Sequence, residues 1–220
     1  MSKTMIVGAR IWDASGGAPF DGDVLVEGNR VRAVSRVSGQ LSQSGCQVID
    51  AAGKFLMPGL VEGHAHLSFE SVTSTEDLIT PPPEEHTLLT ARVAKTLLDH
   101  GFTSAYGASE AKLRLGVAVR NAVDAGRLPG PRIRAGSLEI TVTGGLGDES
   151  KLHNLRPGAP SLVVDGPEEM RKAVRLCCRE GCDNIKLDVS GDPFYPATPE
   201  ALACDSFHRV QPKPRAETRP

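Results

Sequence analysis

The sequence lacks any apolar run long enough to cross a membrane, and its start, MSKTMIVGAR, lacks the hydrophobic region of a signal peptide. It also lacks an excess of charge of one sign. There are 25 basic and 27 acidic residues, the net charge is -2, and neither sign forms a long run. The sequence therefore predicts a cytoplasmic protein that binds neither membranes nor nucleic acid. With 40% hydrophobic and 24% charged residues, it has the composition of an ordinary globular protein.

Cysteines are few, and their number is odd. Of the five, three fall in the segment CCREGC at positions 177–182. Cys178 and Cys182 lie four residues apart near an expected helix end, so they could share a face, but no Cys/His pair lies nearby to complete a zinc site. In a cytosolic protein this pattern favours reduced, packed cysteines over a metal site or a disulfide framework.

The first 57 residues are rich in turns and in short segments typical of strands. Segments 23–28 and 30–35 meet at Gly28-Asn29, a hairpin turn pattern, and further strand material follows at 48–49 and 55–57. These strands are too few to close a barrel of their own. We therefore expect residues 1–57 to form part of a small β domain that needs a partner surface.

Strands and helices alternate after Pro58, which predicts an α/β fold of parallel βα units. An eight-stranded (β/α)8 TIM barrel typically has about 250 residues, so the pattern predicts a partial barrel of about four units over 58–196. The segment 197–220 is rich in Pro and Arg without apolar periodicity, and it is predicted to be disordered. The expected strands are 60–67, 102–108, 132–142 and 184–190, and the expected helices are 84–100, 110–125 and 167–181.

The segment PGLVEGHAHLSF at 58–69 contains two histidines one residue apart. Alternation along a strand puts Glu62, His64 and His66 on one face, with the two histidine Cα atoms about 7 Å apart. Two such imidazoles can bind one divalent cation, and barrel active sites lie where this pair lies, at the C-terminal end of a strand. The spacing alone leaves two interpretations open: a metal site, or two half-buried imidazoles bonded to backbone groups.

A lysine in the middle of the last expected strand is also unusual. In NIKLDVSGD, Lys186 and Asp188 share one face of the strand. Burial disfavours the ammonium form, so Lys186 must pair with a carboxylate, lose its charge or be modified. The sequence leaves two interpretations of Lys186 open: a salt bridge with Asp188, or a carbamate formed with carbon dioxide.

Together these segments resemble the metal-dependent amidohydrolase superfamily. DAAGKFLMPGLVEGHAHLSF is similar to the family's passage from a β-sandwich into the first barrel strand. HGFTSAYGAS, NAVDAGRLPGPRIRAGS, ITVTGGLGDE and GCDNIKLDVSGD then follow in the order of the branch related to imidazolonepropionase and Xaa-Pro dipeptidases. The resemblance covers about residues 4–196. It implies that 1–57 is the N-terminal part of a composite β-sandwich, and that 58–196 is the N-terminal half of a metal-dependent hydrolase barrel.

The resemblance implies roles for three residues. His64 and His66 match metal ligands, and Lys186 matches a lysine that is carboxylated to bridge two metals. The implied cofactor is one or two divalent ions, with zinc first, and a metal-activated hydroxide would attack a carbon–nitrogen bond in a non-peptide or cyclic amide. An Xaa-Pro dipeptidase and a non-catalytic binding or scaffold protein are the alternatives.

The chain also departs from the family pattern. Related sequences often carry TGGHG where this chain has Leu146 in TGGLG. The resemblance further implies two histidines and a proton-shuttling aspartate on later strands, which no segment here matches. We therefore expect a C-terminally truncated, weakly active or inactive form, with its catalytic residue unassigned and a homo-oligomer left open. His153 and Tyr106 are the candidate contacts to a small-molecule substrate, and Ser109 is expected to pack.

Overall fold

The computed structural model describes residues 2–70, 72–148 and 161–189. The chain divides into two compact units, one ending at Gly59 and the other beginning at Leu60, close to the boundary expected at residue 57. The predicted disordered segment 197–220 lies outside the described residues. Within these ranges, no helix combines the length and the apolarity needed to span a lipid bilayer.

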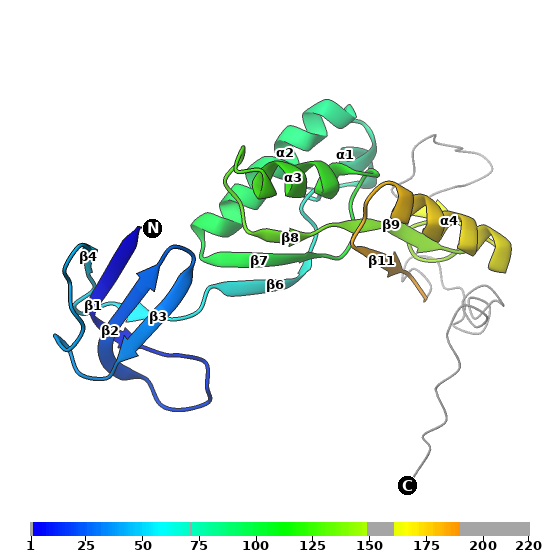
Figure 1. The fold of residues 1–220 in the computed structure, drawn as a ribbon. Helices are drawn as coiled ribbons and strands as arrows, with labels where there is room; N and C mark the ends of the chain where they lie inside the picture. The colour runs from blue at the N-terminus through cyan, green and yellow to red at the C-terminus, as the bar shows by residue number, and fades with distance from the viewer. Residues whose placement is uncertain (1, 71, 149–160, 190–220) are drawn as a thin grey trace, which may run out of the picture. The chain divides into compact units, whose positions relative to one another are not determined.

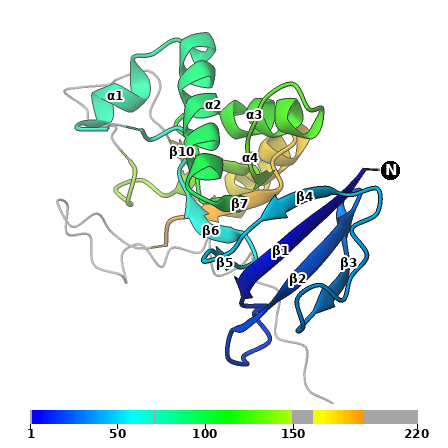
Figure 2. The ribbon, with the colours of Figure 1, turned by 90° about the vertical axis from the view of Figure 1, so that its left-hand side faces the viewer.

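The first unit contains one five-stranded sheet (Figure 2). The order is β3-β2-β1-β4, with β5 also pairing with β1; β1, β2 and β3 are antiparallel, whereas β4 and β5 run parallel to β1. Gly28 and Asn29 form the predicted two-residue turn between β2 and β3, and Gly28 has a φ of 61°. The strands are β1 (Lys3–Ile11), β2 (Phe20–Glu27), β3 (Arg30–Ser35), β4 (Gln47–Asp50) and β5 (Phe55–Leu56).

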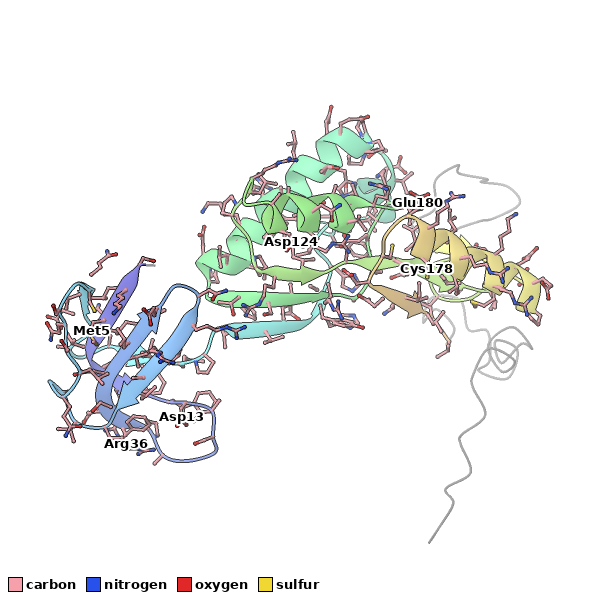
Figure 3. All side chains as sticks on the ribbon, viewed as in Figure 1. Met5, Asp13, Arg36, Asp124, Cys178 and Glu180 are labelled. Carbon is pink, nitrogen blue, oxygen red and sulfur yellow. The ribbon has the colours of Figure 1, made fainter. Side chains whose placement is uncertain are left out.

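The core of the first unit forms around Ala9, Ile11, Val24 and Ala51, and Met5 of β1 is also fully buried (Figure 3). The buried Asp23 is stabilised because its carboxylate accepts hydrogen bonds from the backbone N–H groups of Gly8 and Gly39, at 2.9 and 2.7 Å. Several large apolar side chains of the sheet remain exposed. The structure thus describes one sheet of the first unit with an exposed apolar surface, and the β-sandwich stays a prediction. The exposed set is Val31, Val34, Val48, Ile49 and Phe55.

The second unit begins with a parallel sheet in the order β6-β7-β8, with helices on one side of it (Figure 1). Apolar side chains from the strands and from α2 and α3 form the core between them: Ala65, Leu67, Ala94, Ala105, Val119 and Ile133. The elements are β6 (Leu60–Ala65), α1 (Thr75–Ile79), α2 (Pro83–Asp99), β7 (Phe102–Gly107), α3 (Leu115–Asp124) and β8 (Arg132–Arg134).

A second parallel sheet, in the order β10-β9-β11, continues the same unit. Helix α4 packs on β9; Figure 3 labels Cys178 near its C-terminal end and Glu180, the residue that follows the helix. Ile140, Met170 and Cys177 are among the buried side chains between them. The elements are β9 (Gly136–Thr141), β10 (Ser161–Val163), α4 (Pro167–Arg179) and β11 (Asn184–Leu187).

The parallel strands and intervening helices confirm the predicted α/β fold, whereas the number of βα units remains a prediction. The strand expected at 132–142 is two strands, because the chain changes partners at Ala135: β8 pairs with β7, and β9 pairs with β10 and β11. The carboxylate of Asp183 accepts the Ala135 N–H at 2.8 Å and so replaces a ladder bond at this break. Helix α1 and strand β10 were not predicted.

The helix expected at 110–125 begins only at Leu115. The preceding backbone is bonded elsewhere: the Glu110 N–H donates to the carbonyl of Ser137, and the Ala111 N–H donates to the hydroxyl of Ser68. Arg114 then has a φ of 77°, in the left-handed region, so the chain enters the helix after it.

Candidate metal centre

The histidine pair lies at the C-terminal end of β6, where an irregularity changes the expected alternation. Glu62 pairs with Ala105 and Ala65 pairs with Gly107, so β6 carries one extra residue between these pairs. The prediction that Glu62 shares a face with both histidines is therefore wrong. Its carboxylate turns back instead and accepts a hydrogen bond from the His64 N–H at 2.9 Å.

His64 and His66 lie together on the sheet face opposite the helices, because Ala65 between them points into the helix-covered core. Their ring centroids are 5.0 Å apart in an edge-to-face arrangement, and His66 also stacks on Phe69 at 4.5 Å. Burial lowers the pKa of His66, and the charges of His64 and Lys186 lower it further. His66 is therefore neutral near pH 7, which is the form that binds metal.

One ring nitrogen of His66, Nδ1, is in hydrogen-bond contact with a serine hydroxyl. The Nδ1 atom lies 3.0 Å from the hydroxyl oxygen of Ser109, which is fully buried just after β7. The same hydroxyl donates to the carboxylate of Glu139 on β9 at 3.1 Å. Ser109 is packed in the interior as expected, and its hydroxyl in addition links His66, which follows β6, to β9.

Lys186 enters the same region from β11. In the parallel ladder it pairs with Glu139, so the two side chains share a face of the sheet. Its ammonium lies 3.7 Å from a carboxylate oxygen of Asp188, a residue that is 5% exposed. The salt bridge that was one of the two interpretations of Lys186 is thus present in the structure.

Glu139 and Asp188 form a pair of neighbouring carboxyl groups. Burial raises the pKa of Glu139, and the charge of Asp188 raises it further. Burial also raises the pKa of Asp188, against the opposing charge of Lys186. The Oδ2 atom of Asp188 has no hydrogen-bond donor among the described residues. The two acids are therefore suited to share one proton.

The chemistry of these groups fits part of a divalent metal site. His64 and His66 offer two imidazole nitrogens, and Lys186 would offer a carbamate oxygen if it were carboxylated. Within 2–70, 72–148 and 161–189, no three His, Cys, Asp or Glu side chains are arranged to hold a metal ion. The site therefore depends on the modified lysine or on further ligands.

The two candidate substrate contacts differ in what the structure describes. Tyr106 lies in β7, paired with Arg134, on the face that carries the histidines, and it is half exposed. His153 lies outside the described residues. The loop containing Leu146 passes close by, since a Cβ placed on Gly147 would lie 2.7 Å from a carboxylate oxygen of Glu139. This glycine-containing loop therefore borders the site.

A buried polar cluster lies behind the histidines. His86 is 2% exposed, with Nε2 bonded to the carbonyl of Ser68 at 2.8 Å and Nδ1 lying 3.0 Å from the ammonium of Lys112. Glu110 is also buried, and burial raises its pKa to about 7, although hydrogen bonding from Ser68 lowers it. The cluster connects the segment after His66 with the segment after Ser109, since Ser68 bonds both to His86 and to the Ala111 N–H.

A hollow of the described surface lies away from the histidines. A cavity of about 980 Å³ is lined by residues of β10 and α4, including Leu162, Val164 and Leu176. It contains none of the predicted site residues. The chemistry of the side chains, rather than the size of a hollow, therefore identifies the candidate site at the strand ends.

The sequence matches the model of the amidohydrolase family over residues 55–203. The chain belongs to the amidohydrolase family. This membership, together with the strand-end geometry, confirms the resemblance inferred from the residues.

Three relatives of this amidohydrolase show how far the similarity extends. The chain is 42% identical over 80 residues to a dihydroorotase of Streptomyces coelicolor, covering 36% of this chain and 17% of that protein. It is 32% identical over 159 residues to an ochratoxinase of Aspergillus niger, covering 62% and 31%. A prolidase crystallised with N-methylphosphonate-L-proline is 28% identical, with a TM-score of 0.77 over 91% of this chain and 50% of that chain. The chain thus spans half or less of each of these relatives.

Proposed function

We propose that this amidohydrolase is a metal-dependent hydrolase of carbon–nitrogen bonds in a small molecule. The observation that carries the proposal is the pair His64 and His66 at the end of β6, with the His66 ring neutral and held through Nδ1. In the family to which the chain belongs, this strand end is where the resemblance implies metal ligands. Zinc is the leading ion, since it accepts imidazole and carboxylate ligands together.

Each residue has a defined part in the proposed chemistry. His64 and His66 would hold the ion, and Lys186, as a carbamate, would supply an oxygen ligand. The bound ion would supply a hydroxide nucleophile and polarise the scissile carbonyl. Tyr106 would contact the substrate from the same sheet face. Before carboxylation, Lys186 must leave Asp188 and lose a proton, so the ion pair opposes the modification.

Two substrate classes follow from the comparisons. The similarity to proteins named dihydroorotase and ochratoxinase favours a cyclic amide or another non-peptide amide. The similarity to a prolidase crystallised with a proline-containing phosphonate favours an Xaa-Pro dipeptide as the second candidate. We also propose that the 220-residue chain by itself turns over slowly, because no segment matches the later histidines and aspartate that the resemblance implies.

The test is hydrolysis by the purified chain with zinc and bicarbonate, using dihydroorotate, an N-acyl amino acid and an Xaa-Pro dipeptide as substrates. We expect slow turnover that requires zinc and is lost in His64→Ala. His100→Ala is the matched control, because His100 lies at the end of α2 with its ring bonded to the carbonyl of Thr96. Zinc-independent turnover, or equal turnover in His64→Ala, would contradict the proposal. Bound zinc without any turnover would favour the scaffold alternative.

A further inference from the structure

The hydroxyl of Ser109 stands between two partners but has only one proton to donate. It donates to the Oε1 atom of Glu139 at 3.1 Å, and this oxygen remains an acceptor when the proton that Glu139 shares with Asp188 is carried by the other carboxyl oxygen. The other contact of this hydroxyl, to Nδ1 of His66 at 3.0 Å, must therefore be one in which Nδ1 carries the proton. A neutral imidazole with a proton on Nδ1 has its lone pair on Nε2.

The backbone around Ser109 fixes the position of this hydroxyl. On one side, the Ala108 N–H donates to the carbonyl of Ala65 at 2.7 Å; on the other, the Glu110 N–H donates to the carbonyl of Ser137 at 3.1 Å. Ser109 is fully buried between these two attachments. The hydroxyl is therefore held between β6 and β9, and it does not belong to a mobile surface loop.

We propose that Ser109 and Glu139 are positioning residues that hold His66 as its Nδ1–H tautomer and so present Nε2 as the metal-binding nitrogen. Metal-binding histidines commonly donate their other ring N–H to a carboxylate, a carbonyl or water, which fixes both tautomer and ring orientation. Here a serine hydroxyl stands between the ring and the carboxylate. The role of Nε2 in metal binding rests on the proposed function. The tautomer of His66, in contrast, is a property of the metal-free chain.

A glutamate in this place has no evident packing role. Glu139 lies between Leu138 and Ile140 in a strand whose neighbours are buried apolar side chains. Burying a carboxylate there is unfavourable unless it gains polar partners. The hydroxyl of Ser109 is such a partner, and Lys186 is the cation opposite Glu139 in the parallel ladder. The glutamate is thus placed where it polarises Ser109.

The first test is nitrogen NMR of the metal-free chain with ¹⁵N-labelled histidine, with the His66 signals assigned by their loss in His66→Gln. We expect the Nδ1–H tautomer in the wild type. Ser109→Ala, which removes the acceptor, should give a mixture of tautomers. Ser109→Thr, which keeps a hydroxyl, should restore the Nδ1–H form. A wild-type His66 protonated on Nε2, or a tautomer unchanged in Ser109→Ala, would overturn the proposal.

Glu139→Met is the complementary variant. It removes the acceptor for the Ser109 hydroxyl, so that the hydroxyl proton becomes free to donate to Nδ1 of His66. The ring should then shift toward the Nε2–H tautomer, which a loss of packing alone would not cause. Ser35→Ala serves as the matched control, because Ser35 is a buried hydroxyl of the first unit that bonds to Val37 and Gln40 and not to His66. Thermal unfolding of each variant verifies that it is folded.

The second readout is zinc affinity, measured by competition with a chromophoric chelator. We expect Ser109→Ala to bind zinc about 10- to 100-fold more weakly than the wild type, and Ser109→Thr to recover most of the loss. If the wild type shows the Nδ1–H tautomer but binds no zinc, the proposed function fails and the positioning of His66 stands. If zinc binds equally to the wild type and to Ser109→Ala, the positioning role fails and the proposed function stands.

Discussion

Gly107 on β7 and Gly136 on β9 approach each other so closely that a Cβ placed on Gly136 would lie 2.7 Å from the carbonyl oxygen of Gly107. The obstacle is backbone, which cannot swing aside as a flexible side chain can. Gly136 follows the break at Ala135. At this break β8, which pairs with β7, ends, and β9, which pairs with β11, begins. The two glycines therefore allow the passage from one three-stranded sheet to the next.

We expect Gly136→Ala to lower the free energy of unfolding by about 1–3 kcal/mol, the usual effect of overpacking a tight contact. Gly63→Ala on β6 is the matched control, because a Cβ there meets no atom within 4 Å. Chemical denaturation of both variants provides the comparison. Equal stability of Gly136→Ala and Gly63→Ala would contradict this account of the strand crossing.

The buried Glu110 should make stability depend on pH. Its pKa is raised from 4.5 to about 7 in the folded chain, so folding favours the protonated carboxyl. The stability that comes from keeping this carboxyl protonated is fully present below about pH 4.5. It is lost progressively as the pH rises from there through about 7, and the loss amounts to at most about 3 kcal/mol. Glu110→Gln should therefore show a smaller loss of stability than the wild type between pH 5 and pH 7.5. Parallel curves of unfolding free energy against pH for the two proteins would argue against a neutral Glu110.

Asp183 should matter more for stability than an exposed carboxylate. One of its oxygens accepts from the Ala135 N–H at 2.8 Å and from the guanidinium of Arg120 at 2.6 Å. We expect Asp183→Ala to destabilise the chain by about 2 kcal/mol, because it leaves these donors unpaired. Asp21→Ala is the control: Asp21 pairs with Arg10 at 3.3 Å on the surface, where a loss under about 1 kcal/mol is expected. Equal effects on the unfolding midpoint would contradict the assigned role.

Carboxylation of Lys186 can be observed directly. Incubation with zinc and ¹³C-bicarbonate should give a carbamate carbon signal in the NMR spectrum, because the metal favours the anionic ligand over the Asp188 ion pair. The signal should disappear in Lys186→Ala and persist in Lys172→Ala, which removes an exposed lysine of α4. A wild-type spectrum without this signal would leave Lys186 as the salt-bridge partner of Asp188.

Periodicity and turn patterns predicted most of the regular elements. Helix α2 was expected at 84–100 and is found at Pro83–Asp99, and α4 begins at the predicted Pro167. The helix at Thr75–Ile79 was missed, although Ser74 and Asp77 form a capping box that was available in the sequence. The break at Ala135 could not be predicted, because it depends on the side chain of Asp183, 48 residues later in the chain.

The candidate site was predictable only where its residues are close in sequence. The spacing of His64 and His66 indicated a shared face, and the structure places both at the end of β6. Glu139 was missed, yet its signal was a charged residue inside the apolar strand SLEIT. His86 is buried, although its place in the first turn of a helix is typical of solvated residues, because the carbonyl of Ser68 and the ammonium of Lys112 reach its ring. Such partners come from distant segments and appear only in the folded chain.

Zinc content of the purified, zinc-equilibrated chain tests the central claim most directly. The wild type should retain about one or two zinc ions per chain after removal of free metal. His64→Ala and His66→Ala should each lose that zinc, whereas His100→Ala, altered at the end of α2, should retain it. Elemental analysis of these four proteins gives the numbers. Retention of the wild-type zinc content by both His64→Ala and His66→Ala, or absence of zinc from the wild type, would contradict a metal centre at the end of β6.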